Sequence, residues 1–466
     1  MRGLPNANSP FHSIVHIARR GRDLFLGHLF DIDPDQLPGV RKMILEPRSL
    51  LRLLRRRLPG RVHEGRRGVV TRTYLRLSPR IVKSFKNTPE AQASFKNERL
   101  AHELFNEKLW KIPVLEFRDD GLVMPDLRAS KRLDHVAKRV SETERRRLAV
   151  EALSIALDIH SRGYAHRDFH AANFFVVGDR LLLGDFESMG RYPEGGIPAF
   201  RSSYDLVGEG LDSPFHTGKM CYVKDSPSAL QSVLGVPLKD ALDGLGGLLK
   251  EELREVCQSF EGRASSGGAI GSRRHQCKSN RIYGSFRLPG FLVSAEEAQR
   301  DSAKRFAKFS IQPSDISGFS LLDLGSNIGA MTFCAQAMDP VRSLGIEYDK
   351  KKVETSQRIS SFGGLRNVEF RQGDIDRIST ADLGGQWDVV FCLAIESHVK
   401  DEEHLYSLLS EVTGRVLFFE GNGGCDIAAV TARLRRGGFR EIRELGFCDD
   451  DVRPQNNNRP ILVARR

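Results

Sequence analysis

The sequence predicts a multidomain protein in which an α+β domain precedes an α/β domain built on a parallel sheet. The chain has 466 residues, more than a single hydrophobic core usually supports. Residues 261–280 are rich in Gly and Ser and have no apolar period, so they are predicted to be an interdomain linker. After this stretch, strand-like apolar runs alternate with helix-like segments, as in a parallel sheet with crossover helices.

Composition indicates an ordinary globular protein. Hydrophobic residues make up 40% and charged residues 28% of the chain, and no apolar run is long enough to cross a bilayer. No secretory signal is recognisable, so a cytoplasmic location is expected. The seven cysteines include no CxxC pair, which favours reduced thiols over a structural zinc site. We divide the chain into a basic segment, a first domain, a linker and a second domain: residues 1–62, 63–260, 261–290 and 291–466.

The positive charge is concentrated at the amino terminus. Residues 1–80 contain 17 Lys or Arg and 6 Asp or Glu, an excess of 11 that equals the net charge of the whole chain. In residues 48–61, leucines follow one helical stripe and arginines lie mostly off it. Such a helix can contact an anionic membrane peripherally or bind a phosphorylated substrate, or it can pack on the next domain with its arginines in water. The arginine run lacks interleaved aromatic residues, which argues against a nucleic-acid partner.

The first domain is expected to open with strands. Apolar and polar patterns predict, in chain order, two strands, a helix, two strands, a long helix and a hairpin: residues 68–77, 80–85, 88–109, 112–117, 121–127, 141–161 and 174–185. In the first helix, Ala93, Leu100, Leu104 and Leu109 have helical spacing. Ser141 and Glu144 form a plausible capping box for the second helix.

Five polar residues of the first domain form a pattern suited to phosphoryl transfer. That chemistry needs a carboxylate beside the acceptor hydroxyl, metal ligands, and a lysine held against the nucleotide phosphates by an acidic partner. Asp168, in a His-Arg-Asp sequence, could orient and deprotonate an alcohol, and Asn173 and Asp185 could bind Mg²⁺. Lys83 on a strand and Glu98 on the following helix could form the ion pair at the phosphates.

Together these residues resemble the protein-kinase-like superfamily over about residues 65–260, which implies a bilobal α+β fold that binds ATP and Mg²⁺. No GxGxxG precedes Lys83, residues 185–187 are Asp-Phe-Glu instead of Asp-Phe-Gly, and no Ala-Pro-Glu follows. The stretch is thus more similar to lipopolysaccharide core and Kdo kinases or to aminoglycoside and choline phosphotransferases. Met124 to Asp126 lie where such enzymes receive adenine through backbone groups, although a Pro-Asp turn without a ligand explains them equally well.

A glycine-containing turn follows the first strand of the second domain. Asp323 lies at the strand end, and Gly325 and Gly329 flank a turn that includes Ser326 and Asn327 and opens a helix. Glycines there let the backbone approach a nucleotide-like ligand, and the helix start supplies amide donors. The turn alone would also suit a dinucleotide.

Acidic residues at the ends of the next strands help to decide between a dinucleotide and another nucleotide-like ligand. Glu347 ends the second strand, where its carboxylate can accept hydrogen bonds from two ribose hydroxyls. Asp374 follows the third strand, where it can accept one from adenine N6. The fourth strand, residues 387–395, is followed by Glu396 and His398 at the edge where open α/β sheets place their chemistry.

The order DxGxxxG, acidic residue, GD and WDVV resembles Rossmann-like class I S-adenosylmethionine-dependent methyltransferases across about residues 291–466. By that resemblance, the glycine turn and the aspartate before it border the methionine part of the cofactor, Glu347 the ribose and Asp374 the adenine. A hydroxyl acceptor benefits from a base, for which His398 or Glu396 is nearest, whereas a phosphate oxygen needs none. Either residue can instead cap the following helix.

The two resemblances together imply a bifunctional enzyme. The pair is similar in its parts to enzymes that end bacterial O-antigen chains by phosphorylating the terminal sugar and methylating that phosphate, although the kinase comes first here. We expect a kinase of a sugar or glycolipid, in lipopolysaccharide or surface polysaccharide, fused to a methyltransferase. The alternatives are a small-molecule or protein kinase with an independent O-methyltransferase, and a non-catalytic kinase-like scaffold that binds an acidic partner. The sequence predicts no oligomeric state.

Overall fold

The computed structural model describes most of the chain after residue 59: residues 60–65, 67–75, 78–127, 131–192, 200, 233–258 and 281–466. The predicted amphipathic helix before residue 60 and the Gly/Ser-rich residues 261–280 lie outside the described residues. The described chain forms two compact units, the first with residues 60–156, 164–192 and 233–241 and the second with residues 157–163, 242–258 and 281–466. Among the described helices, none is long and apolar enough to cross a membrane.

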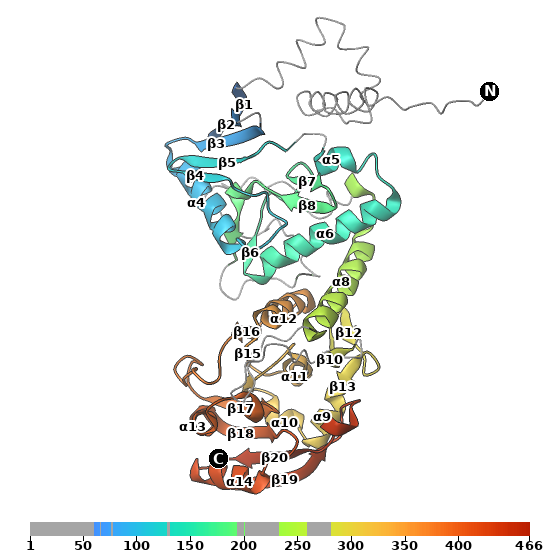
Figure 1. The fold of residues 1–466 in the computed structure, drawn as a ribbon, viewed down its shortest axis with the longest axis vertical. Helices are drawn as coiled ribbons and strands as arrows, with labels where there is room; N and C mark the ends of the chain where they lie inside the picture. The colour runs from blue at the N-terminus through green and yellow to red at the C-terminus, as the bar shows by residue number, and fades with distance from the viewer. Residues whose placement is uncertain are drawn as a thin grey trace, which may run out of the picture. The chain divides into compact units, whose positions relative to one another are not determined.

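The first unit opens with a five-stranded antiparallel sheet in the order β1-β2-β3-β5-β4 (Figure 1). In this order the strands span Gly60–Glu64, Gly68–Leu75, Ser78–Phe85, Gly121–Pro125 and Glu116–Arg118. The predicted strands at 68–77, 80–85 and 121–127 are confirmed, whereas the run 112–117 is extended strand only from Glu116. The sheet begins at Gly60, before the predicted boundary at residue 63, because β1 pairs with β2.

Helix α4, Pro89–Leu104, packs against β3 and begins where the sequence predicted. The side chain of Thr88 accepts a hydrogen bond from the amide of Ala91 and caps the helix. The short hairpin β7–β8 and the short antiparallel pair β6–β9 follow later in the unit, together with helices α5 and α6 and the 3₁₀ turn η3. Strands β6 to β9 span, in order, Tyr164–Ala165, Phe174–Val177, Arg180–Leu183 and Gly190–Arg191. Helix α5 spans Leu133–Val136, α6 spans Glu142–Ser161 and η3 spans Phe186–Ser188.

The apolar residues that indicated helix α4 do not all lie on its buried face. Leu100 is 37% exposed, and Leu109, which lies beyond the helix, is 67% exposed. Instead Phe95 stacks on Phe85 of β3, with 5.1 Å between ring centroids, and Glu98 is buried beside it on the same side of the helix. Apolar spacing alone does not identify the buried face of this helix, because that face includes the charged Glu98.

A seven-stranded sheet forms the centre of the second unit, in the order β16-β15-β14-β17-β18-β20-β19 (Figure 1). Strands β14 to β18 are parallel, and β20 is antiparallel to β18 and β19. In chain order, β14 to β20 span Ser320–Leu324, Arg342–Glu347, Val368–Gln372, Trp387–Leu393, Thr413–Glu420, Glu441–Cys448 and Arg459–Arg465. The four strands predicted from the sequence are confirmed as β14 to β17.

Helices cover both faces of this sheet. Successive strand residues point to opposite faces, so Leu322 and Val390 belong to one apolar core and Leu321 and Val389 to another. Helices α13 and α14 complete the first core, α9, α10 and α11 complete the second, and α12 packs on β15 and β16. Helix α13 spans Glu402–Val412 and α14 spans Ile427–Arg436. Helices α9, α10, α11 and α12 span, in order, Ser302–Lys308, Pro313–Ile316, Ala330–Ala335 and Lys350–Gly363.

Part of the predicted linker is folded into the second unit. Residues 281–290 contain β10 and β11, and the pairs β10–β13 and β11–β12 precede the main sheet. Strands β10 to β13 span Ile282–Gly284, Phe286–Leu288, Phe291–Val293 and Ala298–Arg300. Helix α8, Leu238–Gln258, contributes its later residues to the same unit. The predicted start at residue 291 was too late because Ile282, Phe286 and Leu288 are buried.

Candidate functional site

Three carboxylates surround the ammonium group of Lys83 in the first unit. Lys83 Nζ lies 3.0 Å from Glu98 Oε2, 2.7 Å from Asp185 Oδ1 and 2.8 Å from Glu187 Oε1. The structure therefore brings together the lysine of β3, the glutamate of α4 and the aspartate after β8, as the sequence predicted. It adds Glu187, whose only signal in the sequence was its place in the Asp-Phe-Glu motif.

Burial and charge oppose each other in this cluster. Burial alone would lower the pKa of Lys83, but the charges of Asp185, Glu98 and Glu187 outweigh it and hold that pKa well above its usual value. Burial likewise favours neutral Glu98, yet Lys83 and then His102 lower the pKa of Glu98 to about 2. At neutral pH the pair is therefore ionised, and Lys83 presents a fixed positive charge.

Asp168 lies in the loop between β6 and β7, where its side chain is held by two neighbours. Asn173 Nδ2 donates to Asp168 Oδ2 at 2.9 Å, and His170 Nε2 lies 3.4 Å from Asp168 Oδ1. Burial would raise the pKa of Asp168, but His170, His166 and Asn173 outweigh that effect and lower it. Asp168 is thus an oriented carboxylate, as a group that accepts a hydroxyl proton must be.

The Asp168 loop and the Asp185 turn are joined through His166. His166 Nε2–H donates to the carbonyl of Gly184 at 3.1 Å, and the amide of Gly184 donates to the carbonyl of Asn173 at 3.1 Å. Asp185 itself has a left-handed backbone, with φ of 64°, which is uncommon for a residue other than glycine and occurs often at functional sites. The two segments that carry the predicted metal ligands are therefore neighbours.

Asn173 and Asp185 fit the limited demands of Mg²⁺, which usually takes one or two protein carboxylates together with phosphate oxygens and waters. Because the amide nitrogen of Asn173 faces Asp168, its carbonyl oxygen is the group available to a metal. Among the described residues, no group of three or more His, Cys, Asp and Glu could hold a metal by itself.

Met124 and Asp126, the residues expected to receive adenine, lie at the end of β5. Met124 pairs with Ile81 of β3. The amide of Asp126 donates to the carbonyl of Pro79 at 3.2 Å, and its carboxylate is paired with Arg72. Asp126 is thus tied to neighbouring strands, and the adenine site stays a prediction.

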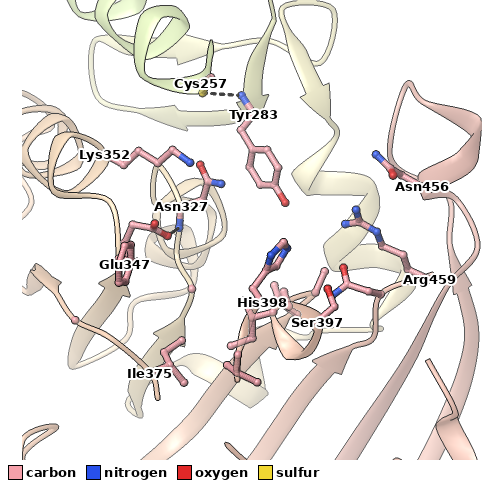
Figure 2. Close-up of a pocket in the computed structure, with 18 of the residues that line it drawn as sticks. Cys257, Tyr283, Asn327, Glu347, Lys352, Ile375, Ser397, His398, Asn456 and Arg459 are labelled. Carbon is pink, nitrogen blue, oxygen red and sulfur yellow. Dashed lines mark hydrogen bonds between the residues drawn. The ribbon is translucent and has the colours of Figure 1, made fainter. Parts of the chain in front are cut away.

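The second unit contains a pocket of about 470 Å³ at the carboxyl ends of its parallel strands. Strand order reverses between β14 and β17, so the turns after these strands open into one crevice, the usual ligand position of such sheets. Figure 2 shows Glu347 and Asn327 on one side, Arg459 and Asn456 on the other, and Tyr283 and His398 pointing toward each other between them. The predicted residues that line the pocket are Gly325, Asn327, Glu347, Asp374 and His398.

The turn after β14 has the backbone geometry that the glycines predicted. Gly325 has φ of 72°, and a Cβ atom there would lie 2.3 Å from Ile395 Cγ2. Asn327 also has a left-handed backbone, and its amide donates to Glu347 Oε2 at 2.9 Å. The amide of Asp349 donates to Glu347 Oε1 at 3.0 Å. Each oxygen of Glu347 keeps a second acceptor position, so the carboxylate can still bind a pair of hydroxyls.

Asp323, Ser326 and Gly329 do not line the main pocket. Asp323 and Ser326 line a cavity of about 20 Å³, which shares Gly325 and Asn327 with the main pocket. A Cβ atom at Gly329 would lie 2.5 Å from a ring carbon of Phe370, so this glycine serves packing. Their direct contact with the methionine part of a cofactor stays a prediction.

Burial makes Asp323 a weak acid. Thr332 Oγ1 donates to its Oδ2 at 2.7 Å, which favours the charged form. Burial outweighs that bond and raises the pKa of Asp323 to about 7.

Glu396 and His398, the two candidate bases, occupy different positions. Glu396 Oε1 accepts from the amide of Asn422 at 2.7 Å and Oε2 from its side chain at 3.1 Å. Burial raises the pKa of Glu396, and it does not line the main pocket. His398 does line it, so the structure favours His398 over Glu396 as a group that can reach an acceptor.

Sequence reasoning missed several residues that line the pocket, among them Tyr283, Gln299, Arg453, Asn456 and Arg459. Tyr283 lies in the stretch taken as linker, and the others follow no recognised motif. Burial would raise the pKa of Tyr283, but Arg300, Arg305 and Arg459 outweigh it and lower that pKa.

Comparisons with solved structures found partial similarities. The crystal structure of EvdMO1 is 21% identical, with a TM-score of 0.30 over 39% of this chain and 43% of that chain. An S-adenosylmethionine-dependent methyltransferase from Mesorhizobium loti is 16% identical, with a TM-score of 0.29 over 37% of this chain and 98% of that chain. The chain thus spans less than half the length of EvdMO1. No curated protein matches.

A family comparison covers the site directly. The family described as a methyltransferase domain matches residues 315–417, a range that contains β14, β15, β16 and β17. The range includes Gly325, Glu347, Asp374 and His398. The comparisons do not test the kinase-like domain predicted for residues 63–260, which stays a prediction. The carboxy-terminal unit contains a methyltransferase domain.

Proposed function

We propose that the second unit transfers a methyl group from S-adenosylmethionine to an acceptor bound in the pocket. The observation that carries this proposal is the position of Glu347, held by the amides of Asn327 and Asp349 at the rim of a 470 Å³ pocket in a methyltransferase domain. Glu347 would accept hydrogen bonds from ribose hydroxyls and Asp374 one from the adenine amino group. The small Gly325 leaves room for the ligand to approach the backbone.

The residues of the pocket then have distinct roles. S-adenosylmethionine supplies an electrophilic methyl group on a sulfonium, so the main task of the protein is to align donor and acceptor. His398 would accept the proton of a hydroxyl acceptor, and an acceptor that is already anionic would need no base. Because Glu396 holds Asn422, it supports the wall of the pocket.

The test is methyl transfer from labelled S-adenosylmethionine to cell-envelope glycan fractions. Glu347→Gln should lower the transfer at least tenfold, since ribose binding loses a charged acceptor. The matched control is Glu369→Gln on the neighbouring strand β16, which lies outside the pocket and pairs with Arg371. Equal transfer by the wild type and Glu347→Gln would contradict the proposed cofactor position.

We further propose that the first unit transfers the γ-phosphoryl group of ATP to an alcohol. The cluster of Lys83, Glu98, Asp185 and Glu187 supports this proposal because it fixes a buried positive charge next to an aspartate with metal-binding capacity. Lys83 would bind the nucleotide phosphates. Asn173 and Asp185 would hold Mg²⁺, which neutralises the charge of these phosphates. Asp168 would orient the acceptor hydroxyl and take its proton.

Phosphorylation by the Asp168→Asn variant tests this second activity. Loss of the base should lower ATP-dependent phosphorylation of the glycan fractions by a factor of about 10² to 10⁴. Binding of S-adenosylhomocysteine by the same variant should be unchanged, which shows that the second unit is folded. Undiminished phosphorylation would contradict the role of Asp168.

The acceptor we propose is a sugar or glycolipid of lipopolysaccharide or surface polysaccharide. The fusion of two transferases is most economical when the first makes the substrate of the second. The basic residues 1–62 would bring the enzyme to the anionic inner face of the membrane. Mass spectrometry of glycan fractions incubated with ATP, Mg²⁺ and S-adenosylmethionine should show phosphate first and methyl only afterwards. Methylation in the absence of ATP would favour two independent activities.

A further inference from the structure

We propose that the methyl acceptor carries an oxyanion, a phosphate or a carboxylate, which Arg453 and Arg459 bind at the end of the pocket opposite Glu347. This inference rests on the proposed methyltransferase function and specifies its substrate class. Both arginines line the pocket, as do Asn422 and Asn456 beside them. Figure 2 shows Arg459 and Asn456 across the pocket from Glu347.

The charges of the pocket are unevenly distributed along its length. Three carboxylates, those of Glu347, Asp374 and Asp376, line the end at β15 and β16 together with one ammonium group, that of Lys352, so this end keeps an excess of negative charge. Guanidinium and amide groups line the end at β18 and β20. An acceptor with a negative group would be repelled from the first end and attracted to the second, which would fix its direction in the pocket.

A buried carboxylate, that of Asp451, holds the loop that carries Arg453. Asp451, 5% exposed, accepts hydrogen bonds from the Arg453 amide at 2.8 Å, from Asn456 Nδ2 at 2.8 Å and from Gln299 Nε2 at 3.0 Å. The bond from Arg453 uses its backbone amide, so its side chain stays available. Within the described residues, the Arg453 guanidinium has no ion pair or hydrogen bond. An unpaired guanidinium on an anchored backbone suits a planar or tetrahedral oxyanion.

Arg459 belongs to a buried ionic cluster under the same end of the pocket. Its Nη1 lies 3.5 Å from Glu420 Oε1, and the same carboxylate is also shared by Arg300 and Arg305. A second carboxylate, Asp450, pairs with Arg300 at 2.6 Å. Asp451 lies 3.8 Å from Arg300, so three carboxylates face the three arginines, and Arg459 has the longest of the three arginine contacts to Glu420.

The arginines of this cluster also act on Tyr283, which lines the same pocket. The pKa of Tyr283 is lowered although burial alone would raise it. The groups that lower it are Arg300, Arg305 and Arg459, against an opposing contribution from Glu420. The charges of these arginines therefore reach the pocket at this end.

The experiment uses the full chain saturated with S-adenosylhomocysteine and titrated with inorganic phosphate or, in a second arm, acetate. Hydrogen–deuterium exchange locates the binding, and the concentration dependence of the protection gives its affinity. We expect protection of residues 449–461 by at least one anion. Arg453→Gln and Arg459→Gln should each weaken this affinity about tenfold or more, because a charge-assisted hydrogen bond is lost. Arg453→Lys should recover part of the anion affinity, since lysine restores the positive charge but cannot form bidentate hydrogen bonds.

The matched control is Arg366→Gln, an exposed arginine that does not line the pocket, and it should leave the affinity unchanged. Protection by phosphate alone identifies a phosphate acceptor, and protection by acetate alone a carboxylate acceptor. If S-adenosylhomocysteine binds but neither anion protects residues 449–461, or if both glutamine variants bind normally, the oxyanion site is overturned while the methyltransferase proposal stands. Failure of the chain to bind S-adenosylhomocysteine would overturn the methyltransferase proposal itself.

Discussion

Lys83 Nζ lies 3.0 Å from Glu98 Oε2, although 15 residues separate them in the chain. Lys83 is 8% and Glu98 1% exposed, so each charge depends on its partners for stabilisation. Asp185 and Glu187 also contact Lys83. The lysine therefore has three counterions, whereas Glu98 has Lys83 and, 3.7 Å away, His102.

This asymmetry predicts unequal effects of two substitutions. Lys83→Met should destabilise the first unit by about 3–5 kcal/mol because it leaves the buried carboxylate of Glu98 without its cation. Glu98→Gln should cost less, about 1–3 kcal/mol, since Lys83 keeps two partners. The double variant should be more stable than the sum of the single effects implies. Hydrogen exchange of the β3 amides in the full chain measures each free energy of opening.

Glu103→Gln is the matched control, because Glu103 lies on the same helix in an exposed pair with Arg99. Its effect should stay below about 1 kcal/mol. Equal costs for Glu103→Gln and Lys83→Met would show that the buried cluster adds nothing to stability.

A second prediction concerns the turn after β14. Gly325→Ala should weaken binding of S-adenosylhomocysteine at least tenfold, because the new methyl group would meet Ile395 and the turn must shift. Gly318→Ala is the control: its φ of 75° is similar to the 72° of Gly325, but nothing lies within 4 Å of the added atom. Calorimetry of the two variants separates the steric effect from the backbone effect. If both lose affinity equally, backbone strain alone is responsible.

The third prediction concerns pH. The pKa of Asp323 is about 7, above its usual value, so the folded state holds a proton that the unfolded state releases. Stability should therefore fall as pH rises from about 4 to about 7, and this loss should be complete above that window. Asp323→Asn should remove this part of the pH dependence. Exchange of the β14 amides at pH 5 and pH 8 measures it, and parallel pH dependence in wild type and variant would contradict the assignment.

The parallel strands of the second unit could be predicted because they are covered on both faces and so form continuous apolar runs, such as Val389–Leu393. The strand ends then placed Glu347 and Asp374 at one edge. The same reasoning does not identify the buried face of α4, because that face includes Glu98 whereas Leu100 is exposed.

Other residues of the site could not be predicted because they come together only in the folded chain. Tyr283 lies on a three-residue strand after a Gly/Ser-rich stretch, too short to give a pattern. Arg453 and Arg459 enter the pocket through the antiparallel end of the sheet, which carries no motif. Their role depends on the position of β20 beside β18, a long-range pairing that local sequence does not encode.

The most direct test of the account is calorimetric titration of the full chain with S-adenosylhomocysteine, for wild type and Glu347→Gln. We predict one binding site per chain and an affinity about tenfold to a hundredfold weaker in the variant, because a carboxylate that accepts ribose hydroxyls is replaced by an amide. Absence of binding to the wild type, or equal affinity in both proteins, would contradict the assignment of this pocket to the methyl donor.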